Sequence, residues 1–133
     1  MSAHRYQDLL AWQKAIAFVE RVYAITSKLP QEEMFGLKSQ MRRSAVSVPS
    51  NIAEGQGRAT RGEFQQFLGH ARSSLYELET QIVIAEKLGF VAAAERDCLL
   101  TEARELGRVL NGLIASLKSL SSEPSARRLT TDN

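Results

Sequence analysis

Residues 36–58 read GLKSQMRRSAVSVPSNIAEGQGR and combine helical periodicity with residue types that are uncommon in helices. At about 100° per residue, one side of a helix through this stretch is apolar and carries Met41, Ala45, Val46, Val48, Pro49, Ile52 and Ala53. The opposite side carries Gln40, Arg43, Ser44, Ser47, Asn51, Glu54 and Arg58. The spacing predicts a helix from about Gly36 or Leu37 to Gly57, with its apolar side in a core.

The polar side of this helix is rich in serine, asparagine and glutamine, where an exposed helix face normally carries lysine and glutamate. Serine and asparagine are poor helix formers because their side chains compete for backbone hydrogen bonds. A row of them predicts close approach by another protein surface, which we expect to be a neighbouring subunit. The residues expected at this oligomer interface are Gln40, Arg43, Ser44, Ser47, Asn51 and Glu54. The alternative is a face that is exposed to water.

Pro49 lies inside the predicted helix and has no amide to bond the carbonyl of Ala45. Either the helix continues with a kink, leaving that carbonyl to Ser50, Asn51 or water, or it stops at Val48 and restarts with Ser50 as its N-cap. The apolar spacing runs through the proline without a change of phase, which favours the kinked, continuous helix.

The stretch from about Asp8 to Lys28 carries two adjoining apolar stripes at helical spacing. The first stripe consists of Leu9, Trp12, Ile16, Val19 and Tyr23, and the second of Ala15, Phe18, Val22, Ile25 and Leu29. Two stripes predict a helix that is buried over more than half of its circumference. Such a helix lies in a bundle interior, or packs one side on the core and the other on another subunit.

Two further helices follow. Thr60 and Glu63 form a capping box that predicts a helix from there to about Leu88, where Gly89 supplies a left-handed terminus. Its apolar positions are Phe64, Phe67, Leu68, Ala71, Leu75, Leu78, Ile82 and Ala85. The last helix is predicted from about Ala92 to Leu120, with a stripe of Leu99, Ala103, Leu106, Leu110, Leu113, Leu117 and Leu120.

Four long helices joined by short links predict an all-α fold, an up-down-up-down four-helix bundle over residues 8–120. Residues 1–7 are expected to form a flexible leader and residues 121–133 a disordered tail. The 133 residues, 44% of them hydrophobic, are typical of one globular domain. Because no apolar run has membrane-spanning length and no signal-peptide pattern begins the chain, we expect no membrane partner and a cytoplasmic location.

No catalytic arrangement is recognisable. His4 and His70 lack the partners of a metal-binding motif, and Cys98 is interpreted as a small apolar side chain rather than a nucleophile. The tripeptide GQG at residues 55–57 lacks both the preceding strand and the following Gly-Lys-Ser/Thr of a phosphate-binding loop. We therefore expect a protein that is not an enzyme and that uses no cofactor and no metal.

The net charge is only +2, but charge is segregated along the chain. Between Lys38 and Arg72 there are six basic residues against two acidic ones, and the rest of the chain has an acidic excess. A positive surface here is compatible with contacts to the phosphates of RNA or DNA. The residues expected to make these contacts are Lys38, Arg42, Arg58, Arg61 and Arg72.

The alternative is that the arginines pair with carboxylates inside the bundle. Glu54 and Arg58 have i,i+4 spacing, and Glu77 and Glu79 on the third helix are further candidate partners for the arginines. Arg42 falls on the apolar side of its helix, where its stem packs and its head reaches outward.

A distinctive set of residues carries a family resemblance that covers about residues 8–120. The set is Leu9, Trp12, Ala15, Pro30, FGL at 35–37, Gln40, RRSAVSVP at 42–49, NIAEG at 51–55, Arg58, Phe64, Phe67, Leu68, Ala71, Glu77, Glu79 and LGF at 88–90. In these positions the chain resembles a family of small bacterial four-helix-bundle proteins encoded in intervening sequences of 23S rRNA genes. A glycine common in the third helix of that family is replaced by Ser73.

The resemblance implies a homopentamer with the bundles arranged around an axis. It extends to the accessory variability protein of diversity-generating retroelements, a pentameric bundle that binds nucleic acid and a reverse transcriptase. Two hypotheses follow. The chain is a pentameric RNA- or DNA-binding protein, or it is a structural or adaptor oligomer that binds a protein partner and uses its arginines internally.

Overall fold

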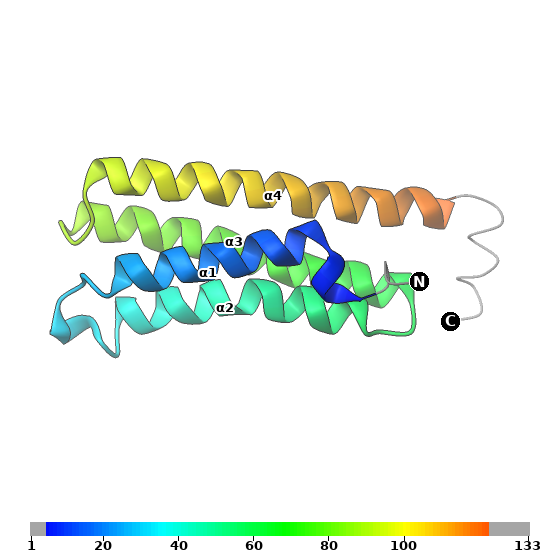
Figure 1. Ribbon diagram of the computed structural model, residues 1–133, viewed down its shortest axis with the longest axis horizontal. Coiled ribbons are helices and arrows are strands. Elements are labelled where there is room, and N and C mark those ends of the chain that lie inside the picture. Colours follow the sequence, from blue (N-terminus) through cyan, green and yellow to red (C-terminus); the bar gives the residue numbers. More distant parts are fainter. Residues whose placement is uncertain (1–4, 123–133) are drawn as a thin grey trace.

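The computed structural model describes residues 5–122 and, of their side chains, those of residues 5–119. Four helices run alternately up and down (Figure 1): α1 (Leu10–Thr26), α2 (Leu37–Gln56), α3 (Arg61–Lys87) and α4 (Ala93–Ser122). Two 3-10 turns, η2 (Tyr6–Asp8) and η3 (Gln31–Glu33), complete the regular structure, and no strand occurs among the described residues. The all-α, four-helix prediction is confirmed.

The predicted leader and tail lie mostly outside the described residues, which exclude residues 1–4 and 123–133. Regular structure begins at Tyr6, within the predicted leader, because the Tyr6 ring packs edge-on against Trp12 with 5.4 Å between ring centroids. A 3-10 turn therefore precedes α1, and α1 itself begins at Leu10.

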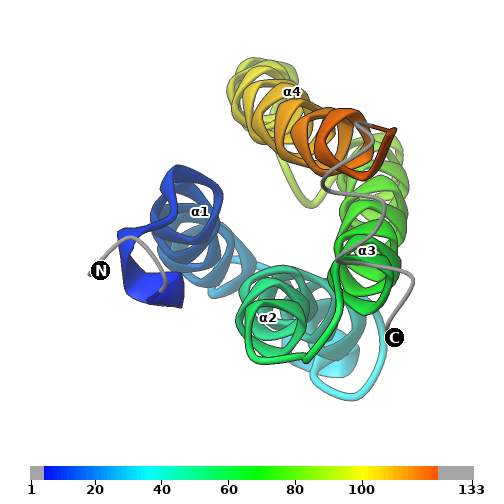
Figure 2. The ribbon, with the colours of Figure 1, turned by 90° about the vertical axis from the view of Figure 1, so that its right-hand side faces the viewer.

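The helices follow an arc in the order α1, α2, α3, α4 when the bundle is viewed along its length (Figure 2). Helices α2 and α3 approach each other most closely, whereas α1 and α4, the first and the last, make the thinnest contact between neighbours. This difference decides which seams between helices are packed tightly and which are bridged by long side chains.

The core lies between the helices and consists of the apolar positions at helical spacing. Its largest fully buried side chains are Phe18, Val22, Met41, Val48, Ile52, Leu68, Leu75, Leu78, Ile82, Leu99, Leu106 and Leu110. Near the end of α4 the buried position is Ile114 rather than the predicted Leu113, which is half-buried. Leu120 is one of the residues whose side chain is not described.

Only one of the two apolar stripes of α1 is covered. The second stripe enters the core, as Phe18 and Val22 show. In the first stripe, Trp12 and Val19 are half-buried and Ile16 and Tyr23 are exposed. Helix α1 therefore does not lie in the interior of the bundle. One of its apolar sides packs on the core, and the other faces outward.

Helix α2 continues through Pro49 without a break, as the unchanged apolar phase predicted. The hydroxyl of Ser50 donates to the carbonyl of Val46 at 2.8 Å, and the side-chain amide of Asn51 donates to the carbonyl of Ser47 at 2.8 Å. These side chains therefore bond the carbonyls after that of Ala45, rather than the one that Pro49 leaves unbonded.

Local signals set both ends of α3. The Thr60 hydroxyl accepts a hydrogen bond of 3.0 Å from the Glu63 amide, as in a capping box, although the Glu63 carboxylate lies 3.4 Å from the same hydroxyl instead of on the Thr60 amide. At the other end Gly89 has a φ of 82°, and the Phe90 amide bonds the Ala85 carbonyl at 2.9 Å. This bond is that of a Schellman motif.

Candidate functional site

The small polar side chains of α2 lie against α3 of the same chain. Ser44 is completely buried, and the hydroxyl groups of Ser47 and Ser74 lie 2.8 Å apart across the seam between the two helices. We expected a neighbouring subunit at this face, but α3 makes the close approach that the small residues permit. Of the predicted interface residues, only Gln40, Arg43 and Glu54 are exposed at the rim.

Two arginines at this rim pair with carboxylates, as the alternative reading of the basic residues predicted. Arg43 lies 3.2 Å from Glu77 on α3 and also donates to Gln40 at 3.1 Å. Arg58 lies 2.8 Å from Glu54. Its guanidinium also covers the ring of Phe67, 4.7 Å from the centroid. Both arginines therefore join α2 to α3.

Arg42 holds the end of α1. Its Nε donates to the hydroxyl of the buried Thr26 at 2.8 Å, and one terminal nitrogen donates to the carbonyl of Tyr23 at 3.2 Å. The guanidinium also lies over the Tyr23 ring, 4.3 Å from its centroid. The Tyr23 carbonyl already accepts the Ser27 amide at 3.1 Å, so Arg42 adds a charged donor to the last turn of α1, where the helix dipole favours a cation.

The five residues expected to contact nucleic acid do not form one surface. Lys38 begins α2 and Arg58 follows it, so about 30 Å of helix separates them. Arg61 is half-buried, with its Nη1 atom buried and unbonded. Arg72 lies on the side of α3 that faces α4, where it donates to Asn111 at 2.9 Å.

A second group of arginines, which the sequence analysis missed, lies beside Arg72. Arg104 and Arg108, one turn apart on α4, are exposed, and within residues 5–119 neither they nor Arg72 form an ion pair. We call this surface the basic groove; it is an open depression of about 260 Å³ lined by Tyr76, Glu79, Arg104, Gly107, Arg108 and Asn111, together with Arg72, which bonds Asn111. The i,i+4 spacing of the two α4 arginines is visible in the sequence, but their proximity to Arg72 is not.

Glu79 is the one carboxylate that lines the basic groove. Its partial burial raises its pKa above the usual 4.5, and the nearby charge of Arg104 acts in the opposite direction. Burial disfavours the charged form of a carboxyl group. A single carboxylate offsets at most one of the three positive charges of Arg72, Arg104 and Arg108.

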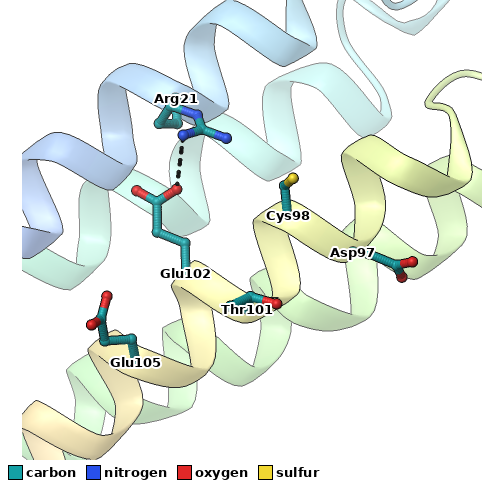
Figure 3. Close-up of a pocket in the computed structure, with 6 residues that line it drawn as sticks. All are labelled: Arg21, Asp97, Cys98, Thr101, Glu102 and Glu105. Carbon is teal, nitrogen blue, oxygen red and sulfur yellow. Dashed lines mark ion pairs between the residues drawn. The ribbon is translucent and has the colours of Figure 1, made fainter.

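The seam between α1 and α4 has a different character, because ion pairs bridge it. Lys14 pairs with Glu105 at 3.6 Å, Arg21 with Glu102 at 3.2 Å and Lys28 with Glu95 at 2.6 Å. Figure 3 shows Arg21 reaching from α1 to Glu102, beside a hollow of about 430 Å³. The hollow is lined mostly by acidic and polar side chains, so it does not favour a polyanion.

Cys98 lines this hollow and is exposed. Leu99 faces the core, and the preceding position is turned about 100° away from it. No histidine lines the hollow to activate the thiol. The described histidine, His70, is exposed on α3 with its ring against Phe67, and His4 lies outside the described residues.

An apolar hollow of about 300 Å³ lies on the outer side of α1 and α2. Its lining joins the uncovered stripe of α1 to the apolar side of α2 and consists of Tyr6, Trp12, Ile16, Val19, Val46, Pro49, Ser50 and Ala53. Ile16 is 36% exposed and Val46 is 40% exposed, so this surface, the α1–α2 apolar surface, is largely uncovered in a single chain.

Two kinds of site are not found in the part of the chain that the structure describes. No three or more histidine, cysteine, aspartate or glutamate side chains gather in a way that could hold a metal ion. None of the helices combines the length and the apolar character that crossing a membrane requires.

Comparison with known proteins connects this bundle to a family. The sequence profile of the family described as 23S rRNA-intervening sequence protein matches residues 7–112. No curated protein matches the chain. Among solved structures, a protein of unknown function from the S23 ribosomal protein family of Bacteroides thetaiotaomicron VPI-5482 superposes with a TM-score of 0.74 at 20% sequence identity. The match covers 80% of this chain and 96% of that one, and it shows a shared fold.

The profile match spans most of the chain and includes the residues of α2 that suggested the resemblance. It also includes Arg72, Arg104 and Arg108 of the basic groove. The chain is a member of the 23S rRNA-intervening sequence protein family.

Proposed function

We propose that this protein is a non-enzymatic, homo-oligomeric helical bundle that binds RNA or DNA through the basic groove. The observation that carries the proposal is the gathering of Arg72, Arg104 and Arg108 on one seam, where none of the three forms an ion pair within residues 5–119. Phosphates are the ligands for which free guanidinium groups are best suited, because they accept paired hydrogen bonds from the planar fork.

This assignment moves the expected contacts away from α2. Arg42 and Arg58 bond groups of their own chain, so their capacity to bind phosphate is already in use. Arg72 is the predicted residue that stays in the proposed site, and Arg104 and Arg108 join it. The low net charge of +2 does not oppose binding, because a local patch can attract a polyanion when acidic residues gather elsewhere, as they do between α1 and α4.

Self-assembly is the second part of the proposal, and the pentamer implied by the family resemblance is its expected form. The α1–α2 apolar surface supports it, because connected apolar surface of this kind commonly marks a site of protein contact. We expect Ile16→Glu with Val46→Glu to lower the mass measured by light scattering to that of one chain. Glu20→Lys changes the charge by the same amount at a position outside the lining of that surface and leaves the assembly intact. A wild-type chain that is monomeric at all concentrations contradicts this part.

An adaptor that binds a protein partner is the alternative, and the internal use of Arg42, Arg43 and Arg58 favours it. In that case Arg43→Ala loosens the α2–α3 rim and dissociates the oligomer. The basic groove would then be a solvated surface, and nucleic acid would not be retained at any salt concentration.

Fluorescence anisotropy with labelled RNA and DNA oligonucleotides separates these functions. We expect binding by the wild type to weaken steeply as salt rises from about 50 to 200 mM. The double variant Arg104→Ala/Arg108→Ala should bind more weakly, and the slope of log Kd against log salt should fall by about one for each arginine removed.

The matched control is Lys14→Ala/Arg21→Ala, which removes the same charge from the α1–α4 seam. We expect it to bind as the wild type does. If the two double variants weaken binding equally, attraction is non-specific and the basic groove is not the site. If the wild type binds neither oligonucleotide at low salt, the nucleic-acid function is wrong and the adaptor remains.

A further inference from the structure

We propose that the basic groove takes single-stranded nucleic acid and stacks one unpaired base on the ring of Tyr76. This inference rests on the proposed function and specifies the form of nucleic acid that the groove accepts. Its basis is the position of Tyr76, an exposed aromatic ring among the three arginines that lack ion-pair partners.

Tyr76 differs from the other two tyrosines in having a free ring. Tyr6 packs against Trp12, and the ring of Tyr23 is covered by the guanidinium of Arg42. Tyr76 is 53% exposed, and within residues 5–119 its ring makes no aromatic or cation–π contact. An aromatic face that the protein does not use is available to another planar group.

The opposite wall of the groove leaves room for such a group. Gly107 on α4 has no side chain, and a Cβ atom there would meet only Leu75 at 3.6 Å, an ordinary contact. The volume of this open depression, about 260 Å³, lies below the roughly 300–1,000 Å³ of pockets for whole drug-sized ligands. A depression bordered by a tyrosine ring and a glycine suits one flat ring rather than a larger molecule.

The surrounding positive charges are suited to the phosphate backbone of the nucleic acid that contains this base. Arg72 lies one turn before Tyr76 on α3, and Arg104 and Arg108 lie across the seam on α4. The phosphate before a stacked base and the phosphate after it would therefore each lie near a guanidinium group. Aromatic platforms flanked by basic residues are the usual means of binding single strands without a sequence requirement.

Stacking on Tyr76 discriminates against a duplex. Bases in a duplex already stack on their neighbours, and unstacking one has an energetic cost, whereas bases in a single strand have accessible faces. The groove also lies along the seam between the antiparallel helices α3 and α4, so its lining comes from the sides of two helices. We therefore expect a preference for single strands over duplexes of the same charge.

The test is fluorescence anisotropy with single-stranded RNA, single-stranded DNA and a hairpin duplex of the same length, each at one salt concentration. We expect both single strands to bind more tightly than the hairpin. Tyr76→Ala should weaken single-strand binding about tenfold and hairpin binding by less than twofold, whereas Tyr76→Phe retains the wild-type affinity.

Ile84→Ala is the matched control, because Ile84 is an apolar side chain of α3 that is 41% exposed and lies about 80° round the helix from Tyr76, outside the lining of the groove. It should change neither affinity. Since both side chains are exposed, all variants should show wild-type helical circular dichroism, which is measured in parallel. Preference for RNA over DNA would identify a contact to the ribose, and equal binding would identify the base and phosphate alone; both outcomes support stacking on Tyr76.

Equal weakening of single-strand and hairpin binding by Tyr76→Ala, or no weakening of either, overturns the inference. The nucleic-acid function survives that result if Arg104→Ala/Arg108→Ala still reduces binding. It fails separately if no oligonucleotide binds the wild type.

Discussion

The Nε atom of Arg42 on α2 donates a hydrogen bond of 2.8 Å to the hydroxyl oxygen of Thr26 in the last turn of α1. Thr26 is completely buried, and its hydroxyl in turn donates to the carbonyl of Val22 at 2.7 Å. An arginine from the Arg42-Arg43 dipeptide therefore completes a chain of hydrogen bonds inside the bundle. Its role is to attach α1 to α2.

Arg42→Lys tests this role, because lysine keeps the charge but cannot reach two acceptors with a planar fork. We expect a loss of about 1–2 kcal/mol in the free energy of unfolding by urea, at one fixed protein concentration. Arg43→Lys, at an exposed ion pair, should change stability by less than about 0.5 kcal/mol. Equal effects of the two substitutions would show that Arg42 contributes only charge.

Gly55 permits the close approach of α2 and α3. A Cβ atom at this position would lie 2.8 Å from the Cβ of Phe67 and 2.9 Å from a ring carbon of Phe64. The overlap costs more than the roughly 1 kcal/mol that alanine gains over glycine in a helix, so Gly55→Ala should destabilise by about 1–2 kcal/mol. Gly69→Ala, where nothing lies within 4 Å, should stabilise by about 0.5–1 kcal/mol. Thermal unfolding of both variants shows whether each substitution raises or lowers stability. A stabilising Gly55→Ala would contradict the close approach of α2 and α3.

The Thr60 hydroxyl caps the first turn of α3 by accepting from the Glu63 amide at 3.0 Å. Thr60→Ala should therefore cost about 1 kcal/mol in urea unfolding. Thr80→Ala is the control, because the Thr80 hydroxyl only bonds the Tyr76 carbonyl within the same helix. Alanine has the higher helix propensity there, so stability should stay equal or rise by a few tenths of a kcal/mol. The cap has no energetic role if both threonines respond alike.

The Lys28–Glu95 pair makes part of the folding stability depend on pH. The hydrogen bond from Lys28, followed by that from the Ala92 amide, holds the pKa of Glu95 below its usual 4.5. Since the folded pKa lies below the unfolded one, this contribution is present above about pH 4.5 and is lost as pH falls through the folded pKa.

Lys28→Ala should consequently lose less stability than the wild type on acidification below about pH 4.5, with a difference under about 1 kcal/mol because the pair is exposed. Urea unfolding at several pH values measures the difference. Lys87→Ala, at an exposed lysine without an ion pair among residues 5–119, should follow the wild-type curve. Identical pH curves for all three proteins would exclude a role of the α1–α4 pair in folding stability.

Glu79 should behave in the opposite way, because burial raises its pKa more than Arg104 lowers it. Glu79 therefore binds a proton more readily in the folded chain than in the unfolded chain. Ionised Glu79 lowers the free energy of unfolding, and this destabilisation disappears as pH falls through the raised pKa. Glu79→Gln should be more stable than the wild type at pH about 7, with the gap narrowing toward pH about 4.

The same substitution removes the negative charge of the basic groove, so Glu79→Gln should also tighten oligonucleotide binding at neutral pH. Glu77→Gln, which breaks the exposed pair with Arg43, should do neither. A Glu79→Gln protein that is less stable at neutral pH would show that attraction to Arg104 exceeds the cost of burial.

The sequence was sufficient for the helices, their ends and the family. Periodic apolar residues, the Thr60–Glu63 cap and the left-handed Gly89 act over a few positions of chain, and the structure has each of them in place. The buried sides of α2 and α3 were predictable for the same reason, as was the pairing of Arg58 with Glu54 one turn away. Local chemistry accounts for all of these features.

The tertiary structure decided which groups from different helices meet. Ser44 and Ser47 face α3 instead of a second subunit, Cys98 reaches the surface, and Arg104 and Arg108 stand beside Arg72. Such contacts depend on the rotation of each helix about its axis and on the antiparallel register that places Arg72 beside Asn111 and Glu86 beside Arg96. Rotation and register follow from the packing of the whole core, and no local stretch of sequence contains that information.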